Sequence, residues 1–124
     1  MAIRDTMRAA AARYVRDGEV VQSVFIGQTA SQYLVGLNRA ITFLPARNRY
    51  RIIAATTERI IVIDTGAHIL GKKSLMMELP RSTRLGPPKG MWHAFTLGSE
   101  KIRVHRRFFA DIQAADARAV AVPA

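Results

Sequence analysis

Clusters of arginine and lysine are the residues of this chain with the clearest chemical consequence. The formal net charge is +10 at pH 7, and no acidic residue occurs between Glu19 and Glu58. Such an excess attracts anionic membranes, nucleic acids or acidic proteins, although a merely solubilising surface has the same composition. The candidate anion- or lipid-binding residues are Lys72, Lys73, Arg81, Arg84, Lys89, Arg103 and Arg106.

A second candidate motif lies at 66–73, where two glycines precede two lysines. The spacing from Gly66 to Lys73 imitates a P-loop, in which backbone N–H groups and a lysine cradle phosphates. However, Lys73 occupies the position that requires a hydroxyl for Mg²⁺, and Pro80 would soon end a following helix. We therefore expect a hairpin loop here and not a nucleotide site.

Side chains for catalysis or metal binding are sparse. The chain has no cysteine, which excludes thiolate catalysis and sulfur-ligated zinc. His68, His93 and His105 are scattered, and the nine acids are spread singly, so no carboxylate pair is available for acid–base chemistry. We therefore predict a protein that is not an enzyme, with no metal, no cofactor and no small-molecule substrate.

Two apolar features accompany the basic residues. Trp92, the only tryptophan, opens a predicted strand, where its ring either covers the core or contacts a membrane or partner. The segment 31–48 is an apolar insertion that fits both a helix and a strand, and we favour a helix from 31 to 44. Its candidate membrane-contacting residues are Tyr33, Leu34, Leu37 and Ile41.

The elements that must position these residues are a helix, several antiparallel strands and a closing helix. An amphipathic helix is expected over 1–18, with Asp17-Gly18 as its stop. From Phe108 onward we expect the closing helix, with Arg106 and Arg107 at the end where the helix dipole disfavours cations, which points to an anion-facing role. Runs of β-branched and aromatic residues predict strands within 20–26, 49–57, 60–64, 75–79, 91–97 and 101–105.

Arg59 follows Thr57 and Glu58 at the turn between the two most apolar strands. An arginine fork there can bind carbonyl groups of the opposite strand. We therefore predict that Arg59 holds the hairpin together and does not contact a ligand. Arg81 and Arg84 are instead expected on the loop surface.

The central stretch 55–64 (ATTERIIVID) resembles bacterial pleckstrin-homology-like (PH-like) domains, which carry a threonine, two intervening residues, then arginine and aliphatics. The segments 80–87 and 104–109 are similar, more narrowly, to a group of small actinobacterial proteins. The resemblance covers 19–116 and implies an α+β fold: a barrel of two near-orthogonal antiparallel sheets closed by a C-terminal helix, here with an extra N-terminal helix. It implies no particular ligand, because this fold serves lipid, peptide and protein binding alike.

The expected organisation is an N-terminal helix (1–18), a PH-like domain (19–118) with the insertion at 31–48, and a tail (119–124). The favoured function is a non-enzymatic basic module that binds anionic membrane lipid peripherally. The alternative is docking of an acidic peptide or protein, and nucleic-acid binding is weaker because the aromatics form no stacking array. Since no apolar run suits a signal peptide or a membrane span, we expect a cytoplasmic location, with the inner face of the membrane as the site of action.

Overall fold

The protein has an α+β fold in a computed structural model that describes residues 3–29, 49–66, 73–98 and 100–119. Two helices bracket the strands, and a short 3₁₀ turn (η1) precedes the second helix. The elements are α1 (Ile3–Ala12), β1 (Val21–Gln28), β2 (Tyr50–Thr56), β3 (Arg59–Gly66), β4 (Ser74–Pro80), β5 (Trp92–Leu97), β6 (Glu100–His105), η1 (Arg106–Phe108) and α3 (Phe109–Ala117).

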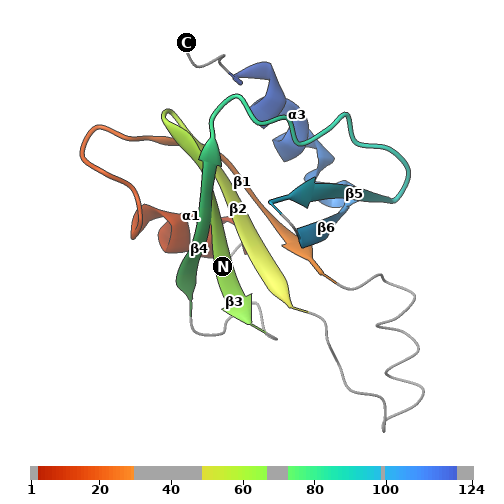
Figure 1. The fold of residues 1–124 in the computed structure, drawn as a ribbon, viewed down its shortest axis with the longest axis horizontal. Coiled ribbons are helices and arrows are strands. Elements are labelled where there is room, and N and C mark those ends of the chain that lie inside the picture. The colour runs from red at the N-terminus through yellow and green to blue at the C-terminus, as the bar shows by residue number, and fades with distance from the viewer. Residues whose placement is uncertain (1–2, 30–48, 67–72, 99, 120–124) are drawn as a thin grey trace, which may run out of the picture.

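The strands form one curled antiparallel sheet in the order β4-β3-β2-β1-β6-β5. Strands β1 to β4 pair along most of their lengths, whereas β1 and β6 pair only through Gln28 and Arg103. Figure 1 shows β1 to β4 as one twisted surface, with the β5–β6 hairpin to its side and below α3. The expected pair of separate sheets is therefore replaced, in the described residues, by a single sheet with one weak joint.

Gly27 is the point at which β6 closely approaches β1. A Cβ atom on Gly27 would lie 2.4 Å from Cγ2 of Ile102 and 3.3 Å from the carbonyl oxygen of Arg103. Only glycine leaves this space. Because strand residues alternate between faces, buried Ile102 and Val104 face the core, while Arg103 and His105 face the other way.

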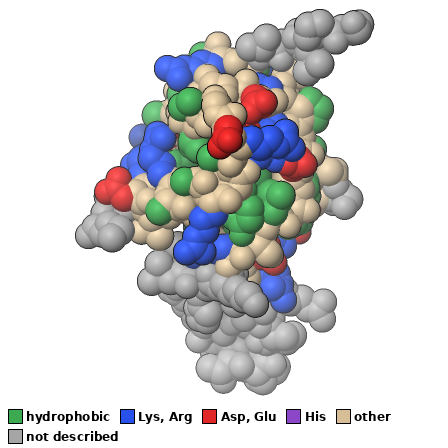
Figure 2. Space-filling view, turned by 90° about the vertical axis from the view of Figure 1, so that its left-hand side faces the viewer, with side chains coloured by type: hydrophobic (Ala, Val, Ile, Leu, Met, Phe, Trp, Pro, Cys, Tyr) green, Lys and Arg blue, Asp and Glu red, His purple; other side chains and the backbone are tan. Residues whose placement is uncertain are grey.

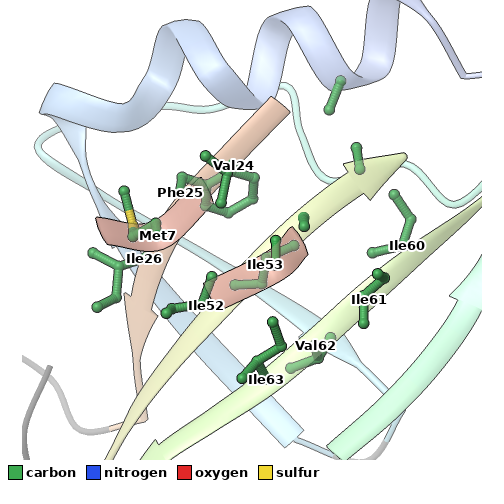
Figure 3. Close-up of a cluster of buried hydrophobic side chains, with 14 of the residues drawn as sticks. Met7, Val24, Phe25, Ile26, Ile52, Ile53, Ile60, Ile61, Val62 and Ile63 are labelled. Atoms are coloured by element: carbon green, nitrogen blue, oxygen red, sulfur yellow. The ribbon is translucent and has the colours of Figure 1, made fainter. Parts of the chain in front are cut away.

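The apolar core is centred on β1, β2 and β3. Successive residues of these strands are buried, and because they point alternately to opposite faces, both faces of the sheet are covered here. The β2–β3 hairpin thus contributes most to the core, as the sequence predicted. Figure 3 shows the labelled members of this cluster: Met7, Val24, Phe25, Ile26, Ile52, Ile53, Ile60, Ile61, Val62 and Ile63.

Helix α1 is shorter than expected. Met7 and Ala10 are buried, as the helical spacing predicted, but the helix ends at Ala12 and not at 17–18. The backbone beyond it is held by tertiary contacts, since the carbonyl of Tyr14 accepts a hydrogen bond of 2.6 Å from Nη2 of Arg59. These contacts favour a turn over further helical residues.

Helix α3 closes the structure and buries Ile112 and Ala115. Its first turn is tied to α1 by the ion pair of Arg4 with Asp111, at 2.9 Å. Its last turn holds the loop between β4 and β5, because the carboxylate of Asp116 accepts hydrogen bonds from the N–H groups of residues 85 and 86, at 2.8 and 2.9 Å. The loop that carries several predicted site residues is therefore fixed to α3.

Candidate functional site

The seven predicted anion-binding residues do not form one cluster. Lys72 lies outside the described residues, as do all four members of the apolar insertion, Tyr33, Leu34, Leu37 and Ile41. Lys73 precedes β4, which three strands separate from β6 in the sheet order. Arg84 and Lys89 are exposed in the loop between β4 and β5, whereas Arg103 and Arg106 belong to β6 and η1.

Arg81 is a buried residue, which corrects its expected place on the loop surface. Its side chain is only 4% exposed. Nε donates to the carbonyl of Thr56 at 2.7 Å, and Nη2 donates to the carbonyl of Ala115 and to Oε1 of Gln22, both at 3.0 Å. Burial lowers the pKa of this guanidinium. Arg81 therefore links β2, β1 and α3 and is not available to a surface ligand.

Arg59 is buried at the β2–β3 turn and has a structural role, as predicted, but with different partners. Its guanidinium donates to both carboxylate oxygens of Glu19, at 2.9 and 3.0 Å, and forms an ion pair with Glu78. Hydrogen bonds from Arg59 and Thr56 hold the pKa of Glu19 at about 2, although burial opposes this shift. The cluster joins β3 to the segment before β1 and leaves Arg59 no free face for a ligand.

All nine aspartates and glutamates belong to the described part of the chain. Five of these carboxylates form ion pairs with four arginines, and on the side of α1 and β4 Figure 2 shows acidic and basic side chains next to one another. The pairs are Arg4–Asp111, Arg16–Glu78, Arg51–Asp64, Arg51–Glu100, Arg59–Glu19 and Arg59–Glu78. None of the acids forms an ion pair with Arg103, Arg106 or Arg107.

Arg103 and Arg107, two of the cations without acidic partners, line a small surface cavity, which we call the β6 hollow. It has a volume of about 120 Å³, and no acidic residue lines it. Its polar and aromatic lining residues are Gln28, Tyr50, Trp92, Arg103, His105, Arg107 and Phe108. A cavity below about 300 Å³ is too small for a typical organic cofactor or substrate, so the hollow suits a small anionic group.

Backbone contacts fix two of the lining side chains. Nη1 of half-buried Arg103 donates to the carbonyl of Thr29 at 2.6 Å. Nδ1 of His105 accepts the N–H of Arg107 at 3.1 Å, so the neutral ring carries its proton on Nε2. The edge of His105 also meets Trp92, with ring centroids 5.0 Å apart. The hollow is thus lined by hydrogen-bond donors whose orientation is set in advance.

An exposed apolar residue lies beside these cations. The carbonyl of Met91 accepts the N–H of Arg106 at 2.8 Å, and Met91 is 58% exposed. Lys89 is two residues away in the same loop and is also exposed. We call Lys89, Met91, Arg106 and Arg107 the basic rim. Its members combine positive charge with one apolar side chain at the surface.

The comparisons give no family for this chain. No family model, no curated protein and no solved structure matches it. In the described residues, no helix is long and apolar enough to cross a membrane, and no group of three or more potential ligands could hold a metal ion. The β6 hollow and the basic rim are therefore the features of this chain that bear on its function.

The sequence identified part of this site. Arg103, Arg106 and Lys89 were predicted, and Trp92 had been considered as a contact to a membrane or partner. Tyr50 was missed because nothing in its neighbourhood distinguishes it from a core residue of β2. The alternation of charged residues along β6 was the one signal that placed Arg103 and His105 on the same face.

Proposed function

We propose that this chain is a non-enzymatic module that binds anionic membrane surfaces peripherally through the basic rim. The observation that carries the proposal is the exposed side chain of Met91 beside cations that have no acidic partner. The antiparallel strand order with a closing C-terminal helix is compatible with the PH-like barrel that the sequence resembles, a fold that serves lipid, peptide and protein binding.

The expected affinity follows from the charges. Each lysine or arginine near an anionic leaflet contributes about 1 kcal/mol. Lys89, Arg103, Arg106 and Arg107 would together give about 4 kcal/mol, which corresponds to a dissociation constant of roughly 1 mM. Insertion of Met91 into the headgroup region adds apolar burial at about 25 cal/mol per Å². The result is a weak, reversible and salt-sensitive attachment.

The apolar insertion gives this proposal further support from connectivity. Residues 30–48 join Thr29 to Arg49, whose backbones are hydrogen-bonded to each other, with the N–H of Thr29 3.0 Å from the carbonyl of Arg49. The carbonyl of Thr29 also binds Arg103 in the hollow. Thr29 and Arg49, the two described residues that flank the insertion, therefore lie next to the site.

Co-sedimentation with vesicles tests the proposal. We expect binding to vesicles that contain phosphatidylglycerol, little binding to neutral phosphatidylcholine vesicles, and a loss of binding as salt rises. Arg106→Glu should weaken it by more than about tenfold, because it removes one attractive charge and adds a repulsive one. Arg13→Glu is the matched control, because Arg13 is exposed just beyond the C-terminal end of α1 and does not belong to the rim.

The result against the proposal would be equal binding to neutral and anionic vesicles at low salt, or equal loss in Arg13→Glu. Capture of one stoichiometric acidic protein that persists in detergent, with no vesicle binding, would favour the protein-docking alternative. A steep dependence of DNA or RNA affinity on salt, without vesicle binding, would favour nucleic acid.

A further inference from the structure

We propose that the β6 hollow is a binding site for one phosphomonoester group, held by Arg103, His105 and Arg107. This inference deepens the proposed function. The phosphate site itself does not depend on membrane binding, and only the assignment of the phosphate to a lipid headgroup rests on the proposed function. The geometry of the hollow supports recognition of the phosphate itself, whether it is carried by a lipid headgroup or is free in solution.

The donors in the hollow match the chemistry of a phosphate dianion. A guanidinium offers paired N–H donors that fit phosphate oxygens, and the hollow has two such groups, from Arg103 and Arg107. The neutral ring of His105 adds an N–H on Nε2, because its Nδ1 is occupied by the backbone. The dianion of a phosphomonoester has only acceptor oxygens, so each of these donors gains a partner.

The size of the hollow limits what it can accept. Its volume of about 120 Å³ is well below the roughly 300–1,000 Å³ of typical organic-ligand pockets. A hollow of this size suits one tetrahedral group with four oxygens. The remainder of a larger ligand would lie outside, next to the basic rim.

The electrostatic surroundings favour a full dianion over a singly charged diester. No carboxylate lines the hollow, so its cations keep their charge for the ligand. The hydrogen bond from Nη1 of Arg103 to the carbonyl of Thr29 and the stacking of the Arg107 guanidinium over the Phe108 ring orient these two groups without neutralising them. A second negative charge on the ligand is therefore stabilised by a second arginine.

Trp92 provides the readout, because it is the only tryptophan and its ring contacts His105. The full chain is titrated at pH 8 with potassium phosphate, and with potassium chloride at equal ionic strength. We expect a saturable change in Trp92 fluorescence with phosphate only. Arg107→Gln should weaken it at least about tenfold, as the loss of a charged hydrogen bond does, while Arg118→Gln, with the same charge change outside the hollow, should not.

A second variant and a second ligand complete the test. Arg103→Met should remove the response while the melting curve shows a folded protein, and if it does not fold, Arg107→Gln decides alone. Vesicles containing phosphatidic acid, a monoester, are compared with phosphatidylglycerol, a diester, at equal surface charge. Preference for phosphatidic acid assigns the site to lipid headgroups, whereas a phosphate response without that preference assigns it to a soluble phosphate.

The two proposals can fail separately. Vesicle binding with no phosphate response, or an equal response in chloride, would overturn the phosphate site and leave the membrane proposal standing. A phosphate response lost in Arg107→Gln, with no vesicle binding, would support the site and overturn the membrane proposal.

Discussion

Replacement of Glu19 by glutamine measures how much the buried ion pair with Arg59 stabilises the fold. The folded-state pKa of Glu19 is about 2, against an ordinary value of 4.5. This difference of about 2.5 units is worth roughly 3 kcal/mol at neutral pH. Breaking a buried pair by removing one partner costs a similar amount, about 3–5 kcal/mol. In a domain of this size we expect the melting temperature to fall by about 10–15 °C.

The pH dependence gives the sharper test. Because the pKa is lowered in the folded state, the stabilisation is complete above pH 4.5 and is lost as the pH falls toward 2. Melting curves of wild type and Glu19→Gln, followed by circular dichroism from pH 7 to pH 3, should therefore converge below pH 4.5. The exposed Glu58→Gln is the control for charge alone and should change little. A difference between wild type and Glu19→Gln that stays constant over this range would refute the role of ionisation.

Three further substitutions follow from the described contacts. Arg81→Ala should lower the unfolding free energy by about 2–3 kcal/mol in urea titrations, because it removes charged hydrogen bonds in the interior. The exposed control Arg84→Ala should change the unfolding free energy by no more than about 0.5 kcal/mol. Equal effects of the two substitutions would contradict the burial of Arg81. Gly27→Ala should cost about 1–3 kcal/mol by overpacking against Ile102, and unchanged stability would show that the β5–β6 hairpin can move away. Asp116→Ala should lower the protection of the neighbouring loop amides in hydrogen exchange, and unchanged protection would show that α3 does not hold the loop.

The fold could be predicted from the sequence wherever local pattern and burial agree. The β2–β3 hairpin is a dense run of isoleucine and valine on both faces, and α3 has Ile112 and Ala115 at helical spacing, so both followed from periodicity. The pairing of β1 with β6 did not follow from periodicity. It consists of one residue pair, Gln28 with Arg103, and depends on the absence of a side chain at Gly27. Nothing local to either strand encodes that contact.

Arg81 shows why the site was harder to predict than the fold. It follows Pro80 in a segment rich in turn-forming residues, which normally indicates a surface loop. Its partners are the carbonyls of Thr56 and Ala115, far away in the sequence, and any backbone can supply a carbonyl. A buried arginine of this kind leaves no sequence signal.

The placement of the nine acids supports the proposal that part of the excess charge serves binding at one surface. A solubilising charge would be spread with cations and anions interspersed. Here five acids are used in ion pairs, Asp116 binds backbone N–H groups, and Asp5, Asp17 and Glu58 belong to α1, the segment after it and the β2–β3 turn. None lines the β6 hollow. Arg4, Arg16, Arg51 and Arg59 pair with acids, and the lack of an acid in the hollow supports the proposal that Arg103 and Arg107 bind an anion from outside.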